Sequence, residues 1–210
     1  ELMSNSELVN FSIQYIRAKF GLKVTTSYQL IDMMTDVRNL LDHLGIDSAH
    51  IIGLSMGGMI AQLLAIHETI RVKSLTSIMS SSSRKNLPGP KWNVILHMLR
   101  RPKKGDEVSI KNYLRKLWRI LGSPRYPKEK KELDEFITRL LSRGMTAGGV
   151  GRQRLAIIAS SSRNKDLTKI DVPSLIIHGD ADPLVPLECG IDTANSIPNA
   201  KLEIIYGMGH

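Results

Sequence analysis

Apolar residues recur along positions 28–44 with the period of an α-helix. They stand three or four positions apart, at Leu30, Met33, Met34, Val37, Leu40, Leu41 and Leu44. This spacing places them on one face of a helix. Thr26, with Gln29 three residues later, fits a capping box at the start of that helix, and Gly45 suits its C-terminal end. We therefore predict an amphipathic helix that ends before Gly45.

Four shorter apolar runs have the length and composition of buried strands. They are AHIIGL (49–54), VKSLTSIMS (72–80), VPSLIIHG (172–179) and KLEIIY (201–206). Helix-like segments alternate with them, at 57–67 and near 187–197. Strands that alternate with helices pair in parallel through crossover connections. The pattern therefore predicts an α/β fold in which helices flank a parallel sheet.

The pattern changes after the second predicted strand. Serine, glycine and proline crowd the stretch SSSSRKNLPGP, and prolines interrupt the following sequence at Pro102, Pro124 and Pro127. Helical patterns recur there near 91–100, 108–121, 129–143 and 150–161. We expect a mostly helical insertion over residues 84–165, which divides the core into two parts, 1–83 and 166–210.

The length and composition suit one globular domain. Of the 210 residues, 42% are hydrophobic, and no apolar run approaches the roughly 18 residues of a membrane helix. The opening ELMSNSELVN lacks the basic and apolar regions of a signal peptide. Cys189 is the single cysteine, so no disulfide can form within the chain, and we interpret it as a small buried residue. We therefore expect a cytoplasmic protein without a transmembrane segment.

The formal charge of +9 is concentrated in the insertion. Residues 84–165 hold 21 Lys and Arg against 6 Asp and Glu, whereas the rest of the chain holds 8 against 14. A solvated outer face of the helices explains this charge, although attraction of anionic substrates or of a membrane surface would also explain it. Trp92, Tyr113, Trp118 and Tyr126 interleave with basic residues, as in some nucleic-acid-binding segments. Their helical spacing favours packing instead, and we expect no nucleic-acid partner.

Candidate chemistry begins at Gly53-Leu54-Ser55-Met56-Gly57, between a predicted strand and a predicted helix. A serine on a sharp turn from strand to helix is the setting of the nucleophile in G-x-S-x-G motifs. We expect Gly53 and Gly57 to be required because a Cβ there would hold strand and helix apart. Ser55 is therefore a candidate nucleophile, the alternative being a glycine-rich turn without chemistry.

A serine hydroxyl needs a general base, and the base needs an orienting acid. Asp180 and Asp182 follow the third predicted strand, and His210 follows the fourth. The carboxyl ends of parallel strands meet at one edge of a sheet, where these residues would join Ser55. Either aspartate could be the acid, but Pro183 favours Asp182 because proline restricts the backbone of the residue before it.

The remaining histidines show no metal-binding spacing, and we interpret them as structural. They are His43, His50, His67, His97 and His178.

The chain order of serine, aspartate and histidine resembles that of the α/β-hydrolase superfamily. The resemblance runs from about Tyr28 to His210. The stretches GLSMGGMIAQ, HGDADPLVP and GMGH are most similar to carboxylesterases of the aclacinomycin methylesterase type. The resemblance implies that Ser55 is the nucleophile, Asp182 the acid and His210 the base, with the backbone N–H of Met56 as one donor to the oxyanion.

The resemblance also implies parts that are not recognisable here. In the superfamily a loop upstream of the nucleophile, usually with a His-Gly pair, supplies a second oxyanion donor, and residues 1–54 contain no such pair. We recognise four strands of the usual eight or so, and no helix after the histidine. By the same resemblance, residues 84–165 form a lid. We expect an internal fragment of a longer hydrolase that is inactive and poorly stable as a 210-residue polypeptide.

Together these features predict cleavage of a carboxylic ester through an acyl-enzyme intermediate. The expected partner is a small-molecule ester, and no metal or organic cofactor is required. Aminopeptidase, lactonase and cofactor-free haloperoxidase reactions use the same kind of triad, and a non-catalytic ligand-binding protein of this fold is a further alternative. The sequence leaves the substrate and the oligomeric state open.

Overall fold

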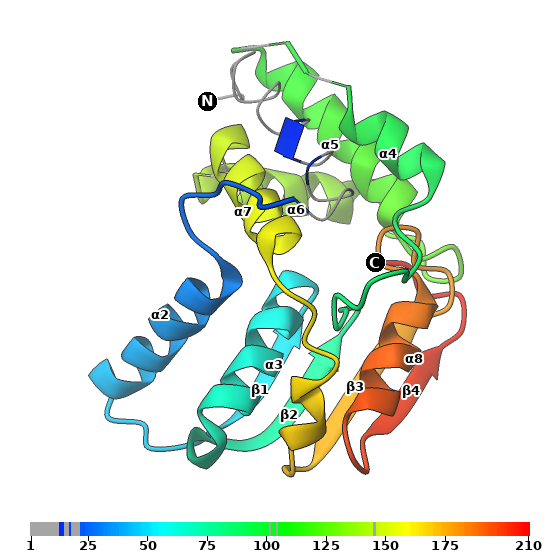
Figure 1. Cartoon of the computed structure of the whole chain (residues 1–210). Coiled ribbons are helices and arrows are strands. Elements are labelled where there is room, and N and C mark those ends of the chain that lie inside the picture. Colours follow the sequence, from blue (N-terminus) through cyan, green and yellow to red (C-terminus); the bar gives the residue numbers. More distant parts are fainter. Residues whose placement is uncertain (1–12, 15–16, 18–21, 101, 104, 145) are drawn as a thin grey trace. The chain divides into compact units, whose positions relative to one another are not determined.

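A computed structural model describes residues 13–14, 17, 22–100, 102–103, 105–144 and 146–210 (Figure 1). The chain separates into two compact units. The sheet unit comprises Leu30–Lys91, Leu121–Tyr126 and Ser161–His210. The helical unit comprises Trp92–Ile120, Pro127–Ser160 and the described residues that precede Leu30. Both units therefore combine segments that are far apart in the sequence.

The sheet unit is built on parallel strands that lie side by side in the order of the sequence. They are β1 (Ala49–Leu54), β2 (Val72–Ile78), β3 (Ser174–Gly179) and β4 (Lys201–Ile205). Ile51 lies opposite Leu75, and Ile78 lies opposite Ile177. Because β2 and β3 are neighbours, the long insertion leaves the sheet at one strand and returns at the next. The predicted α/β fold with a parallel sheet is confirmed.

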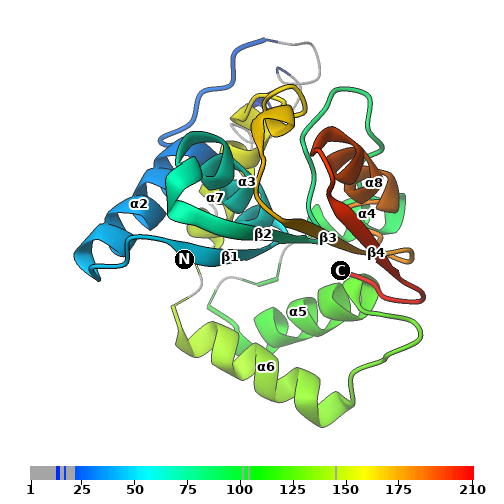
Figure 2. The same ribbon diagram turned by 90° about the horizontal axis from the view of Figure 1, so that it is seen from below.

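Among the described elements, helices α2 (Leu30–His43), α3 (Met56–His67) and α8 (Leu187–Ser196) lie on one face of this sheet (Figure 2). Two 3-10 helices, η1 (Thr69–Arg71) and η2 (Asp166–Lys169), lead into β2 and β3. All three α-helices were predicted from the sequence, which placed their ends within two residues of the observed bounds.

The core of the sheet unit lies between these helices and the strands. Leu64 of α3, Leu75 of β2 and Leu167 of η2 are fully buried there, beside Ile170 and Ile176. Burial of each such side chain contributes about 1.5–3 kcal/mol to folding. Helix α3 packs against β1, β2 and α2, which explains why its sequence is apolar on nearly every side.

The sequence predicted the C-terminal end of α2 correctly and its N-terminal cap wrongly. Gly45 has a φ of 64°, and the N–H of Ile46 donates back into the last turn, so the helix ends in a Schellman motif as its glycine predicted. The predicted capping box is wrong. The helix begins at Leu30, and the hydroxyl of Thr26 donates to the carbonyl of Tyr28 instead of accepting from a helical N–H.

The helical unit contains α4 (Trp92–Met98), α5 (Glu107–Leu121), α6 (Lys130–Ser142) and α7 (Ala147–Ala159). These helices correspond to the four predicted helical stretches. Leu114, Leu133 and Ile137 form a small core between α5 and α6. Within the described ranges, no helix is both long enough and apolar enough to cross a membrane.

Two of the aromatic residues in this unit have packing roles. The ring of Trp118 meets that of Phe136 edge to face at 4.8 Å, and the ring of Tyr113 stacks on His97 at 4.6 Å. This is the role that their helical spacing favoured over base stacking. Trp92 is exposed.

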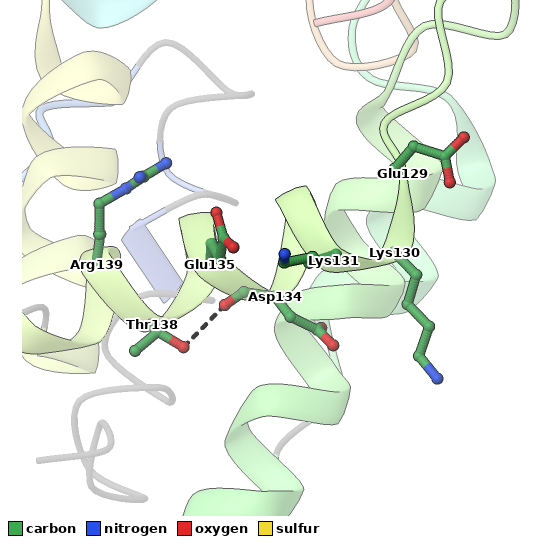
Figure 3. Close-up of a pocket in the computed structure, with 7 residues that line it drawn as sticks. All are labelled: Glu129, Lys130, Lys131, Asp134, Glu135, Thr138 and Arg139. Carbon is green, nitrogen blue, oxygen red and sulfur yellow. Dashed lines mark hydrogen bonds between the residues drawn. The ribbon is translucent and has the colours of Figure 1, made fainter.

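The surface along α6 is strongly charged. A hollow of about 850 Å³ is lined by Glu129, Lys130, Lys131, Asp134, Glu135, Thr138 and Arg139 (Figure 3). Acidic and basic side chains mix there, and the hydroxyl of Thr138 donates to the backbone carbonyl of Asp134. Mixed charge of this kind is typical of a solvated helix face. None of the candidate triad residues lines this hollow.

Candidate active site

Ser55 occupies the turn between β1 and α3, and its backbone is strained. Its φ of 52° lies in a region that residues other than glycine rarely adopt. Its N–H donates to the carbonyl of Ile78 at the end of β2, at 2.8 Å. The turn therefore holds the Ser55 side chain at the carboxyl end of the sheet, where the chains after β3 and β4 also emerge.

Of the two motif glycines around Ser55, only Gly53 is sterically required. A Cβ at Gly53 would overlap the carbonyl of Gly57, so only glycine fits at that position, as predicted. A Cβ at Gly57 would meet no atom within 4 Å, so the expectation of a steric requirement there is wrong. The strand approaches the backbone of Gly57 and not the side where a Cβ would stand.

The neighbouring Gly58 is the glycine of α3 at which a side chain has no room. A Cβ on Gly58 would lie 2.6 Å from the Cβ of Ser80 and 2.9 Å from the Oγ of Ser77. The motif does not include this position. Only the packing of α3 against the end of β2 reveals it.

The structure brings Ser55, His210 and Asp182 together although they are far apart in the sequence. His210 Nε2 lies 2.9 Å from Ser55 Oγ, and His210 Nδ1 lies 2.7 Å from Asp182 Oδ2. A carboxylate only accepts, so Nδ1 carries the hydrogen and Nε2 is free to accept from the serine hydroxyl. This is the geometry of a nucleophile, a base and an orienting acid.

Asp182 is buried and tightly held. Its Oδ1 accepts hydrogen bonds from the backbone N–H groups of Leu184 (2.8 Å) and Val185 (2.9 Å), which leaves Oδ2 for His210. Asp180, the competing candidate, is exposed and accepts from the N–H of Gly207 at 2.6 Å. Asp180 thus stabilises the turn that leads to His210. Asp182 is the aspartate that contacts the imidazole of His210.

The segment 121–126 forms hydrogen bonds with the loop that carries His210. The N–H of His210 donates to the carbonyl of Leu121 at 2.8 Å, and the N–H of Gly209 donates to the hydroxyl of Ser123 at 2.9 Å. A Cβ at Gly209 would overlap the carbonyl of Leu121. The sequence predicts this segment to be part of the helical insertion. No local pattern indicates that residues 121–126 would form hydrogen bonds with residues more than 80 positions away.

Arg163 forms a buried polar contact beneath α3 that the sequence analysis did not identify. Its Nε donates to the side chain of Gln62 at 3.1 Å, and one terminal nitrogen donates to the carbonyl of Ser81 at 2.7 Å. Gln62 in turn donates to Ser77 Oγ at 3.2 Å. Burial lowers the pKa of Arg163 to about 10. This contact joins the end of the insertion to the helix that follows Ser55.

Cys189 is buried on α8, and burial raises the pKa of its thiol. A buried, protonated thiol agrees with the predicted structural role. Among the residues that the structure describes, no group of three or more His, Cys, Asp and Glu side chains is placed to hold a metal ion.

Comparison with known proteins identifies the fold of the chain. Residues 11–103 match a family model described as the α/β hydrolase fold. The structure of a meta-cleavage product hydrolase from Pseudomonas fluorescens matches this one with a TM-score of 0.67 at 22% identity, covering 89% of this chain and 66% of that one. The chain therefore has the α/β-hydrolase fold.

Relatives in sequence include esterases and lactonases. Rhodomycin D methylesterase from Streptomyces peucetius is 27% identical over 208 residues, which cover 87% of this chain and 67% of the relative. The 3-oxoadipate enol-lactonase 2 from Acinetobacter baylyi is 26% identical over 178 residues, which cover 85% of this chain and 63% of the relative. The chain thus spans about two thirds of the length of these relatives.

Proposed function

We propose that the protein is a serine hydrolase that cleaves a carboxylic ester through an acyl-enzyme intermediate, with Ser55, His210 and Asp182 as its catalytic triad. The observation that carries this proposal is the continuous hydrogen-bond chain through His210, 2.9 Å on the serine side and 2.7 Å on the aspartate side. The strained turn at Ser55 supports it, because strain of this kind persists where function requires a fixed geometry.

In the first step, Ser55 Oγ attacks the ester carbonyl carbon while its proton passes to His210 Nε2. The tetrahedral intermediate collapses, the bond to the leaving oxygen breaks, and His210 gives that oxygen the proton, so an alcohol departs. In the second step, His210 takes a proton from water, and the resulting hydroxide attacks the acyl carbon. Ser55 then leaves with the proton. Asp182 stays ionised and orients the imidazole throughout.

The negative charge on the carbonyl oxygen needs a hydrogen-bond donor, and we assign one to the backbone N–H of Met56. Met56 is the first residue of α3, and the first N–H groups of a helix have no partner within it. The positive end of the helix dipole also lies there. A preorganised donor of this kind contributes about 3–4 kcal/mol to transition-state stabilisation.

The names of two relatives support an ester as the substrate. One carries the name of a methylesterase and another that of an enol-lactonase. A lactone is a cyclic ester, so both names describe the same bond and the same two steps. We further propose that the helical insertion between β2 and β3 serves as the lid of this site, with its basic surface solvated.

Labelling of the complete protein with a fluorophosphonate tests the proposal. We expect covalent modification of Ser55 in the protein and none in Ser55→Ala, detected by peptide mass spectrometry. Absence of labelling on folded protein would instead favour a non-catalytic binding protein of the same fold. A panel of methyl esters, lactones and anilides then separates esterase, lactonase and amidase activity. The concentration of active enzyme in these assays is obtained by titrating Ser55 with the fluorophosphonate.

A further inference from the structure

A second histidine, His178, lies directly behind the aspartate of the proposed triad. It is the penultimate residue of β3, before Gly179, and is fully buried. Its Nε2 lies 2.8 Å from the backbone carbonyl oxygen of Val185 and 3.8 Å from Asp182 Oδ2. We propose that His178 is a positioning residue, which fixes the carboxylate of Asp182 through the backbone of Val185. This inference rests on the proposed function.

The surroundings of the His178 ring determine which nitrogen carries its hydrogen. A carbonyl oxygen can only accept, so Nε2 must donate to Val185. Nδ1 is buried without a hydrogen-bond partner among the described residues, and it lies against Gly190 of α8, where a Cβ would overlap it. The ring is therefore held in the tautomer with hydrogen on Nε2, and Gly190 provides the space that it occupies.

Val185 transmits this constraint to the triad. Its carbonyl accepts from His178, and its N–H donates to Asp182 Oδ1 at 2.9 Å. Both backbone groups of Val185 are thus bound, one on each side of the residue. The carbonyl lies in the peptide between Val185 and Pro186 and the N–H in the peptide between Leu184 and Val185. Without the donor at His178, Val185 is free to shift as a residue, which withdraws its N–H from Oδ1. The carboxylate would then rotate, and the bond from Oδ2 to His210 would lengthen.

The three residues that carry this proposal are close together in the sequence, around one loop. His178, Asp182 and Val185 lie four and three residues apart, where the chain leaves β3 and turns toward α8. From the sequence alone His178 is interpreted as structural, because its spacing to other histidines and cysteines fits no metal site. The pattern contains no sign that its hydrogen would reach the carbonyl of Val185.

His97 provides a matched control within the same chain. It is also buried, its Nε2 lies 3.0 Å from the backbone carbonyl oxygen of Tyr113, and its Nδ1 likewise lacks a partner among the described residues. The two histidines therefore share chemistry and burial. His97 belongs to the helical unit and has no contact with the proposed triad in any described hydrogen bond.

Two amide substitutions separate hydrogen bonding from packing. The side-chain nitrogen of glutamine reaches about as far as Nε2 of histidine, whereas that of asparagine reaches only as far as Nδ1. We expect His178→Asn to lower kcat about tenfold with KM unchanged, the effect of losing one positioning hydrogen bond. We expect His178→Gln to restore most of the activity, and His97→Asn and His97→Gln to match the wild type, all per fluorophosphonate-reactive site.

A spectroscopic signal reports the geometry independently of turnover. The proton between His210 Nδ1 and Asp182 should give a downfield proton resonance, and we expect His178→Asn to shift or broaden it while His178→Gln and both His97 variants keep it. If the folded His178→Asn protein keeps both the wild-type resonance and the wild-type kcat, the positioning role is overturned. If the wild type shows no labelling of Ser55, the proposed function fails, and the resonance alone decides the role of His178.

Discussion

The hydroxyl of Ser80 donates a hydrogen bond of 2.8 Å to the backbone carbonyl of Ser55. Together with the bond from the Ser55 N–H to Ile78, it ties both backbone groups of Ser55 to the end of β2. A backbone with positive φ at a non-glycine residue costs about 1–3 kcal/mol unless its surroundings hold it. These two bonds, with those from the N–H groups of Gly58 and Met59 to the Ser55 carbonyl, hold the turn at Ser55.

Replacing Ser80 with alanine tests this contact. We expect the free energy of unfolding, measured with urea, to fall by about 1 kcal/mol, because a partly buried hydrogen bond is lost. Fluorophosphonate labelling of Ser55 should slow by about three- to tenfold, since the same bond holds the turn. In the control Ser142→Ala, an exposed hydroxyl bonded to the carbonyl of Arg139 is lost, and both quantities should stay near wild type. Equal effects of the two substitutions would contradict this role for Ser80.

The two glycines of the motif should respond in opposite ways to alanine. Gly53→Ala forces a Cβ into the carbonyl of Gly57, and we expect a loss of more than about 3 kcal/mol or failure to fold. Gly57→Ala adds a methyl group in open space within α3, where alanine has the higher helix propensity. We therefore expect a gain of up to about 1 kcal/mol. Thermal unfolding followed by circular dichroism measures both, and a comparable loss at Gly57 would show that the geometry described for the turn is incorrect.

The two aspartates of the acid loop should differ in the same assay. Asp182→Asn replaces the acceptor of the His210 hydrogen with an amide, and we expect kcat for ester hydrolysis to fall by about 10⁴, as expected when the imidazole is held in the wrong tautomer. Asp180→Asn keeps an oxygen that can accept from Gly207, so we expect less than about a tenfold change. If the Asp180 variant loses as much activity as the Asp182 variant, the assignment of the acid is wrong.

Arg163 should contribute to stability through its hydrogen bonds. Arg163→Met leaves the buried side-chain oxygen of Gln62 and the carbonyl of Ser81 without this donor. Each unsatisfied group costs about 1–3 kcal/mol, although loss of a desolvated charge offsets part of this. We expect a net loss of about 2 kcal/mol in urea unfolding. Arg152→Met, at an exposed position of α7, should change stability by less than about 0.5 kcal/mol, and a similar value for Arg163 would refute its structural role.

Much of the fold and of the candidate site could be predicted because the information is local. Alternation of apolar runs with helical periods placed β1 and β2, and a glycine after the last apolar position placed the end of α2. Ser55, Asp182 and His210 could be selected because each follows a strand, and the ends of parallel strands meet at one edge. These features depend on a few neighbouring residues, whose conformational preferences do not require knowledge of the rest of the chain.

The sequence by itself therefore determined the parallel α/β fold and the three residues proposed for the triad. Only the tertiary structure decided that Gly58 is the crowded glycine of α3 and that Leu121–Tyr126 forms hydrogen bonds with the loop of His210. It also decided that Arg163 and His178 form buried hydrogen bonds with Gln62 and Val185. The reason is that steric contact and hydrogen bonding act between atoms that are neighbours in space. For Arg163 and Gln62 the partners lie 101 residues apart, a separation over which no local pattern carries information.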